Sequence, residues 1–299
     1  NKQINDDENT PKPDISIQIE QSISVEKMSA SATIFIDIVD EHFSELIKES
    51  KKLTSNLISF TKQPSEEGLQ KTIKILEKTH ALFLSGYFLD SCCFIYTQNI
   101  AKSENNSESI SVKTRLDQQP LLPGYLDVVD GYPYSGLIYS DIPITRENME
   151  QEFQLGDPAY VTLGFHALEL ILKGSNLKRT TSDFAQLTST SDTSTAPAEL
   201  RRTLYAILLA SEIEKDISSL HLSWESTHKK QLRLKTTNQS NNFFLALNLM
   251  LEKELGSIPS EHENPEKTLI DDHFTLESIS LKKALLEKLT SLKTLEAES

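Results

Sequence analysis

The chain has 299 residues, of which 25% are charged and 37% hydrophobic, a composition typical of globular proteins. Its length suggests about two domains, and only 9 glycines disfavour a glycine-loop nucleotide fold or a turn-rich β sandwich. The formal net charge of -14 argues against nucleic acid as a partner, because phosphates bind surfaces rich in Lys and Arg. The chain contains no apolar run of about 18 residues, so we expect no transmembrane span.

Residues 1–25 are polar, acidic and proline-bearing, which is typical of a flexible tether rather than a folded element. Beyond them, apolar side chains recur at spacings of three and four from Phe35 to Phe60. This period predicts an amphipathic helix that ends before Pro64. The first folded element is therefore expected to be one long helix.

A second helix is predicted from Ser65, a good N-cap ahead of two glutamates, to about Ala101. Its apolar content rises after His80, so we expect its second half to be buried. That half contains Cys92 and Cys93. Neighbouring residues on a helix point about 100° apart, so a disulfide between these two would be strained. We interpret them as buried thiols.

Residues 121–149 contain several prolines and glycines, together with four of the eight tyrosines. A single helix cannot accommodate this composition. Long irregular segments inside helical proteins are usually functional loops or linkers. The tyrosines and aliphatic residues favour a packed loop over disorder. Asp130 and Tyr132 lie near its middle.

The next predicted helix begins with Asp157 as N-cap and Pro158 in its first position, and it ends at Gly174. Most of its surface is apolar, which predicts an interior helix. At 100° per residue, four polar side chains fall on one stripe about 60° wide. These are Thr162, His166, Glu169 and Lys173. A stripe of this kind must face a partner, a water-filled cleft or a ligand.

His166 and Glu169 are three residues apart, so one imidazole nitrogen and one carboxylate oxygen can reach the same divalent cation. Two ligands are too few for a stable site, so others must come from elsewhere. The alternative is a structural network in which Glu169 pairs with Lys173, four residues on. The same spacing recurs at His42 and Glu45. That second pair lies on a mixed, charged helix, and we interpret it as a solvated face.

The rest of the chain again shows helical periodicity. A Ser/Thr-rich stretch, residues 178–198, is predicted to be a mobile loop. Helical patterns follow at residues 198–226, 241–258 and 273–299. The predicted fold class is all-α, with two antiparallel helical bundles packed together. The first bundle is expected over residues 26–150 and the second over residues 151–299.

Four motifs in this order resemble the imelysin family. "GFHALE", residues 164–169, fits its Gly-x-His-x-x-Glu signature. Residues 60–83 resemble its first helical hairpin, and "VVDGYPYSGLI", residues 128–138, is similar to its Asp-Gly-Trp-Pro loop with Tyr132 in the aromatic place. "RRTLYAILLASEIEKDI", residues 201–217, is similar to its Arg-Arg-x-x-Tyr helix. His273 lies where the family often has a His-Ser-x-Phe-Ser element, but the sequence around it departs from that element.

The resemblance implies two helical bundles with the signature helix near their interface. It also implies export to the periplasm or cell envelope, with lipid anchoring through a residue before Asn1, and an association with iron uptake. The implied ligand is a metal ion, iron or zinc, or an iron-bearing molecule. His166 and Glu169 would bind the metal, Asp130 and Tyr132 would close the site, and the flanking stripe residues Thr162 and Lys173 would contact the ligand. Iron-uptake components of the outer or inner membrane are the implied partners.

Two other functions stay open. The family was first named for a peptidase activity, so a zinc-dependent metallopeptidase is one alternative. However, the sequence has no His-Glu-x-x-His motif, no identified general base and no Ser or Cys nucleophile with a clear base. We therefore assign no catalytic residue. The other alternative is a protein-interaction module in which His166, Glu169 and Lys173 form a structural network.

Overall fold

The computed structural model describes residues 15–87, 89, 99–100, 110–187, 195–233, 247, 249–250, 253 and 276–297. Most of the described chain is helical, as predicted, and strand is limited to one two-residue pair. The larger helices are α1 (Ile15–Lys62), α2 (Glu66–Ser85), α7 (Phe165–Lys173), α8 (Ala198–Ser223) and α12 (Leu276–Ala297). The short helices are α4 (Val112–Leu116), α5 (Pro123–Leu126), α6 (Arg146–Glu152), α9 (Lys229–Arg233), the 3-10 turns η1 (Leu137–Tyr139) and η2 (Thr181–Asp183), and the π-helical turn η3 (Trp224–His228). Strand β1 (Asn99–Ile100) pairs antiparallel with β2 (Ile110–Ser111).

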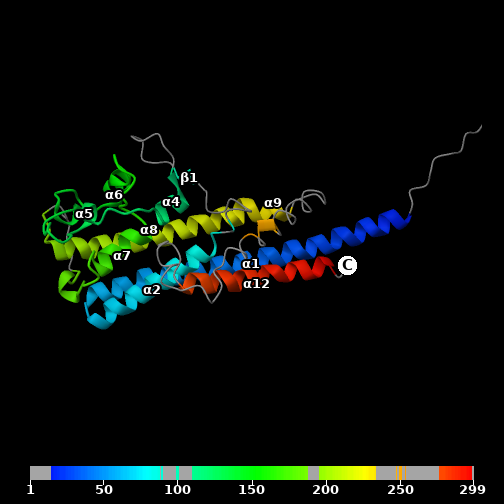
Figure 1. The fold of residues 1–299 in the computed structure, drawn as a ribbon, viewed down its shortest axis with the longest axis horizontal. Helices are drawn as coiled ribbons and strands as arrows, with labels where there is room; N and C mark the ends of the chain where they lie inside the picture. Colours follow the sequence, from blue (N-terminus) through cyan, green and yellow to red (C-terminus); the bar gives the residue numbers. More distant parts are fainter. Residues whose placement is uncertain are drawn as a thin grey trace, which may run out of the picture.

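The long helices lie side by side along the molecule. Helix α1 contacts α2, α8 and α12, and α12 also contacts α2 (Figure 1). Helix α7 packs between α2 and α8 at one end, where α4, α5 and α6 also lie. The buried apolar side chains of these helices belong to one cluster. Elements from both predicted halves therefore share a core, and the division into two bundles stays a prediction.

The apolar stripe predicted for the first helix forms the buried face of α1. Phe35, Val39, Phe43, Leu46, Leu53 and Leu57 all lie in the core with no exposed side-chain surface. The helix begins at Ile15, so it includes residues 15–25 of the predicted tether, while residues 1–14 lie outside the described chain. Polar side chains are compatible with a helix, whereas proline disrupts a helix interior. Pro11 and Pro13 of the predicted tether precede the first helical residue.

Helix α2 starts as predicted and ends earlier than predicted. The Ser65 hydroxyl accepts a hydrogen bond from the backbone N–H of Gly68 at 3.1 Å, which caps the first turn. The helix stops at Ser85, because Gly86 follows as C-cap and the chain turns there. The predicted end at Ala101 is therefore wrong. Cys92 and Cys93 lie outside the described residues.

The segment 121–149 packs against the core, as predicted. Leu126, Leu137 and Ile138 are buried. Arg201 of α8 is also buried, and its guanidinium donates hydrogen bonds to the backbone carbonyls of Leu137, Ile138 and Ile142 at 2.6–2.8 Å. One side chain of the Arg-Arg pair thus supplies the donors that this irregular backbone needs.

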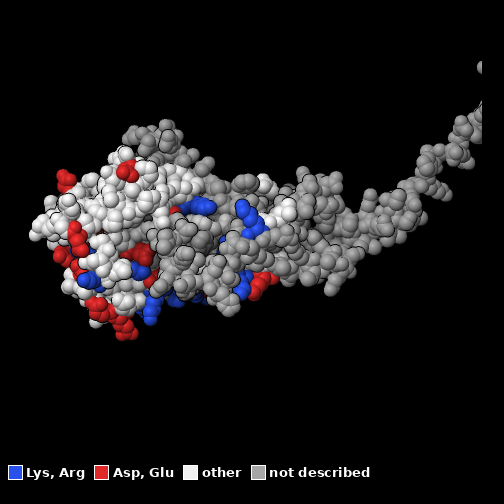
Figure 2. All heavy atoms as spheres, viewed as in Figure 1, with Lys and Arg blue, Asp and Glu red and all other residues white. Residues whose placement is uncertain are grey.

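The described surface carries charged side chains of both signs (Figure 2). On the face shown in Figure 2, Asp and Glu side chains lie interspersed with Lys and Arg over the described part of the chain. Among the described helices, none is both long enough and apolar enough to cross a membrane.

His42 does not lie on a solvated face, so that interpretation is wrong. Its side chain is buried on α1 beside Phe43. Leu281 and Leu285 of α12 line a small cavity together with His42 and Leu82. The covering helix comes from the other end of the sequence, so the local pattern around His42 could not reveal its burial.

The free energy of unfolding should fall as pH drops from about 6.5 towards 4, because burial lowers the pKa of His42 to about 4. An unfolded histidine titrates near 6.5, so the unfolded chain takes up the proton first and gains stability relative to the folded chain. At pH 4.5 the loss attributable to His42 is about 2.5 kcal/mol, at ~1.4 kcal/mol per pKa unit. His42→Phe should remove this part of the pH dependence, measured by urea unfolding at several pH values. Ser44→Ala, on the exposed side of the same turn, should leave it unchanged, and equal slopes for all three proteins would contradict the assignment.

Candidate metal centre

The signature helix is shorter than the sequence suggests. Helix α7 begins at Phe165, so the predicted start at Asp157 and Pro158 is wrong, while the predicted end at Gly174 is confirmed. Asp157 instead closes a local turn, in which its Oδ1 accepts a hydrogen bond from the backbone N–H of Ala159 at 2.8 Å. Asp157, which the sequence indicated as an N-cap, thus stabilises a turn. Aspartate favours both structures, because its carboxylate accepts hydrogen bonds from nearby backbone N–H groups in each.

Gly164 explains why the helix cannot start earlier. Its φ is +90°, a conformation that L side chains rarely adopt. A Cβ at this position would lie 2.4 Å from the carbonyl oxygens of both Arg115 and Leu116. The glycine of the signature thus allows the start of α7 to touch the end of α4. As a result, Asp117, directly after α4, comes next to His166.

His80, Asp117 and His166 form a cluster at this contact. Asp117 Oδ1 lies 2.7 Å from His80 Nε2 of α2 and 2.8 Å from His166 Nε2 of α7. One ligand atom from each of the three residues lies within 4.8 Å of the others. We call these residues the His–Asp–His cluster.

Neighbouring side chains fix the cluster. Phe165 stacks on the His80 ring with centroids 4.5 Å apart. The Tyr87 hydroxyl donates a hydrogen bond to Asp117 Oδ2. The Asp117 side chain is 1% exposed, whereas His80 and His166 are 15% and 11% exposed. The carboxylate therefore lies at the buried end and the imidazoles reach towards solvent.

A buried ion pair anchors the segment that carries Asp117. Arg115, two residues earlier, donates from Nε to Asp216 Oδ2 of α8 at 2.7 Å, and its Nη2 also pairs with this carboxylate. Its Nη1 donates to Glu150 Oε1 of α6 at 3.0 Å. Such bidentate pairs hold both partners in a defined orientation, so the position of Asp117 is set from the α8 side.

Asp117 is ionised across the physiological range. Burial alone would raise the pKa of its carboxyl, but the hydrogen bonds from His166 and His80 outweigh burial and hold the pKa far below its usual range. The carboxylate is thus available both as hydrogen-bond acceptor and as metal ligand.

Two imidazoles and one carboxylate are the donors of the facial triad that binds non-haem Fe(II), and similar sets bind zinc. With metal–ligand bonds of about 2.1 Å, neighbouring donors are about 3.0 Å apart in an octahedral site and about 3.4 Å apart in a tetrahedral one. The two Asp117–His separations of 2.7 and 2.8 Å are nearer the octahedral value. The donor set therefore fits a divalent transition metal.

Glu169 and Lys173 lie on the same helix face but outside this cluster. Glu169 Oε2 is 4.0 Å from His166 Nδ1, while its Oε1 pairs with the Lys173 ammonium at 2.7 Å. Lys173 also pairs with Glu77 of α2 at 2.7 Å. This charged network connects α7 to α2. Within it, the Glu169–Lys173 pair is the contact that the structural alternative predicted.

The other three predicted residues lie apart from His166. Thr162 precedes the helix and is fully buried, and its hydroxyl donates to the Met149 carbonyl. Asp130 lines a separate cavity at the far end of α7. The Tyr132 side chain is 68% exposed.

Sequence reasoning found one residue of the cluster and missed two. His80 and Asp117 come from different elements and share no motif with His166. The weak signals were His80, a polar residue at the start of the apolar half of the second predicted helix, and Asp117, an aspartate at the end of the polar stretch 103–117. Neither signal specifies a ligand without the contact made through Gly164.

The fold and site define a helical protein with a His–Asp–His cluster whose carboxylate is buried and whose imidazoles are partly exposed. No protein-family model matches the chain, and no curated protein is found to be similar to it. The imelysin resemblance thus rests on the sequence motifs, and its functional implications are proposals.

Proposed function

We propose that this protein binds a divalent transition metal ion, Fe(II) or Zn(II), through His80, Asp117 and His166. The observation that carries the proposal is the single carboxylate oxygen held 2.7 and 2.8 Å from two imidazole nitrogens. Imidazole and carboxylate suit iron and zinc better than copper(I), which prefers sulfur. Three protein groups are fewer than the four to six donors that zinc and iron take, so water or a chelating ligand would complete the coordination.

Within the same proposal, the protein is an envelope component of iron uptake. The imelysin-like motifs support this extension, together with a donor set that suits iron. The ion would arrive bare or in an iron-bearing molecule, and membrane components of iron uptake would be its partners. Cell fractionation and growth under iron limitation test this extension.

Metal binding is preferred over peptide hydrolysis. A zinc peptidase needs a general base beside the metal-bound water. Glu169 Oε2 lies 4.0 Å from His166 Nδ1, and its Oε1 is bound by Lys173. The structural role proposed for Glu169 and Lys173 rests on this pair and on the 2.7 Å contact with Glu77.

Asp117→Asn and His166→Gln should each weaken metal binding at least about 100-fold. Even the loss of a residue that only orients a metal-ligating side chain typically lowers metal affinity 10–100-fold. Glu169→Gln should change the affinity much less. Anaerobic calorimetry with Fe(II), calorimetry with Zn(II), and the visible absorption bands of bound Co(II) would measure affinity and coordination. Far-ultraviolet circular dichroism of each variant would confirm that the helices are intact.

The same titrations distinguish the candidate ligand sets. A loss in Glu169→Gln as large as that in His166→Gln, with affinity unchanged in Asp117→Asn, would support the ligand pair predicted from the signature alone. Absence of binding to the unsubstituted protein by all three metals would overturn the metal proposal and leave the His–Asp–His cluster as a structural hydrogen-bond network.

A further inference from the structure

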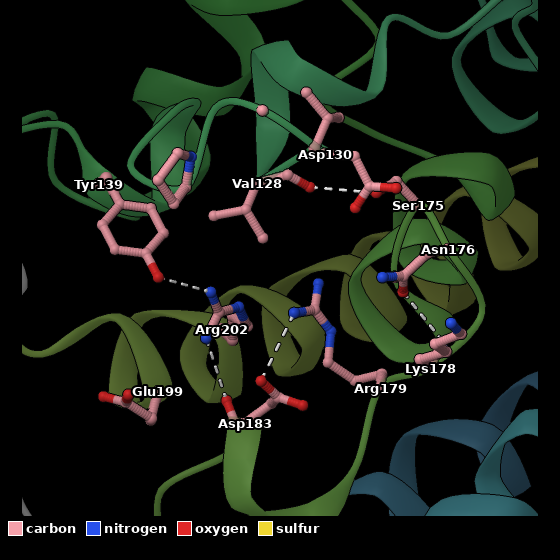
Figure 3. Close-up of a pocket in the computed structure, with 14 residues that line it drawn as sticks. Val128, Asp130, Tyr139, Ser175, Asn176, Lys178, Arg179, Asp183, Glu199 and Arg202 are labelled. Carbon is pink, nitrogen blue, oxygen red and sulfur yellow. Dashed lines mark hydrogen bonds and ion pairs between the residues drawn. The ribbon is translucent and has the colours of Figure 1, made fainter.

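A second cavity lies at the other end of α7. Its volume is about 420 Å³, within the range of about 300–1,000 Å³ that is typical of small-molecule sites. It lies between the 128–133 loop, the 174–179 turn and the start of α8 (Figure 3). Helix α7 has 9 residues, which corresponds to a length of about 13 Å, so the cavity is separate from the His–Asp–His cluster.

Two arginines form the floor of this cavity. Arg202 donates to both carboxylate oxygens of the buried Asp127, at 2.7 and 3.0 Å. Arg179 donates to Asp127 from Nη2 at 2.7 Å and to the Ile171 carbonyl from Nε at 3.3 Å. Two guanidinium groups thus share one buried carboxylate, and the carboxylate of Asp183 lies further away, 3.8 Å from Arg179 Nη1.

Arg179 has one nitrogen left for a ligand. Its Nη1 makes no hydrogen bond to any described residue, and its nearest ion-pair partner, Asp183 Oδ1, is 3.8 Å away. Figure 3 shows this guanidinium directed towards the middle of the lining residues. The side chain is only 6% exposed. Arg179 lines the cavity, so an acceptor placed there could approach Nη1 more closely than the 3.8 Å that separates it from Asp183.

The rim carries charges of both signs. Lys178, Asp130 and Glu199 are exposed, and within the described chain no ion pair engages their charged groups. In Figure 3, Lys178 and Asn176 lie on one side, and Glu199 lies on the other, near Tyr139. Asn176 Oδ1 accepts from the backbone N–H of Lys178 at 3.1 Å, which leaves its amide N–H groups for a ligand.

Charges of both signs exclude simple ions as good ligands. An anion that binds Arg179 and Lys178 also approaches Asp183, Glu199 and Asp130. A lone cation is opposed by the two basic residues. A molecule with an anionic and a cationic end satisfies both sets, since complementary charges select against ligands of the wrong sign.

We propose that this cavity binds a small zwitterion that carries a carboxylate and an ammonium group, a free α-amino acid or a dipeptide. Its carboxylate accepts from Arg179 Nη1, Lys178 and the Asn176 amide. Its ammonium group faces Glu199 and Asp183. The Tyr139 ring supplies an apolar wall beside the ligand.

The test is calorimetry and thermal unfolding of the full chain with glycine, L-alanine, L-glutamate, L-lysine and glycylglycine. Propionate, propylamine and inorganic phosphate serve as ligands with one charged group. At least one zwitterion should bind saturably and raise the unfolding temperature. Propionate and propylamine should bind at least about tenfold more weakly, because each lacks one charge-assisted contact. The amino acids and glycylglycine distinguish the two kinds of zwitterion.

Variants locate the binding. Arg179→Lys keeps a cation next to Asp127 but removes the Nη1 donor, so affinity should fall about tenfold or more. Lys178→Ala and Glu199→Gln are rim changes that should each cost up to about fivefold. Lys48→Ala, an exposed residue of α1, is the matched control and should change nothing. Phosphate or propionate binding as tightly as the zwitterions would show a plain anion site and overturn the proposal. Absence of binding by every zwitterion, or affinity unchanged in the three cavity variants, would also overturn it.

Discussion

Asp127→Asn should lower the free energy of unfolding by about 3–5 kcal/mol, the loss expected when one partner of a buried ion pair is removed. The Asp127 side chain is 1% exposed and is bound by Arg202 and Arg179, whose side chains are 3% and 6% exposed. Arginine cannot relieve the burial by losing its proton. The substitution therefore removes the carboxylate that Arg202 and Arg179 share, and it leaves Arg179 only the longer pair with Asp183 at 3.8 Å.

Asp130→Asn provides the matched control for Asp127→Asn. It makes the same chemical change three residues later, at an exposed position on the same loop. Surface substitutions usually stay within about 0.5 kcal/mol. Urea unfolding of both variants measures the difference. Similar values for the two would mean that the Asp127 pairs contribute little to stability and that solvent screens both arginines.

Gly164→Ala should lower the free energy of unfolding by about 2–6 kcal/mol. Its backbone, at φ +90° and ψ -170°, lies in a region essentially restricted to glycine, where another residue costs roughly 1–3 kcal/mol. The added methyl group would also lie 2.4 Å from the carbonyl oxygens of Arg115 and Leu116, and crowding of this kind typically costs a further 1–3 kcal/mol. The backbone of α4 or α7 must move apart to make room.

Gly131→Ala isolates the clash from the conformational strain. Gly131 has nearly the same φ, +87° against +90°, but no atom lies within 4 Å of the position that its Cβ would occupy. Gly131→Ala should therefore lower the free energy of unfolding only by the cost of the strained backbone conformation. Gly164→Ala should also weaken metal binding, because it separates Asp117 from His166, whereas Gly131→Ala should not. Equal unfolding energies for the two variants would contradict the close approach of α4 and α7.

Each residue of the Gly-x-His-x-x-Glu motif has its own structural role. Its glycine permits the α4–α7 contact, its histidine reaches Asp117 across that contact, and its glutamate pairs with Lys173 at 2.7 Å. The three signature residues thus have three different neighbours. The spacing of His166 and Glu169 predicted a shared ion; in the structure Glu169 pairs with Lys173, and the other residues of the His–Asp–His cluster come from α2 and the end of α4.

Local sequence patterns were sufficient for features that depend on neighbours along the chain. The spacing of apolar residues by three and four predicted the buried face of α1. Ser65 predicted the start of α2, and Gly174 predicted the end of α7. They also predicted that segment 121–149 packs without forming a long helix. Periodicity and capping depend on residues within a few positions, and for this reason they can be read without a structure.

Contacts between distant segments decided the rest. The burial of His42 depends on α12, and the start of α7 depends on the approach of Gly164 to Arg115 and Leu116. The same approach brings His80, Asp117 and His166 together from three elements. The sequence by itself determined the helical character and one imidazole of the cluster. The tertiary structure supplied the other two residues of the cluster, because only packing brings together residues that are 37 and 49 positions apart.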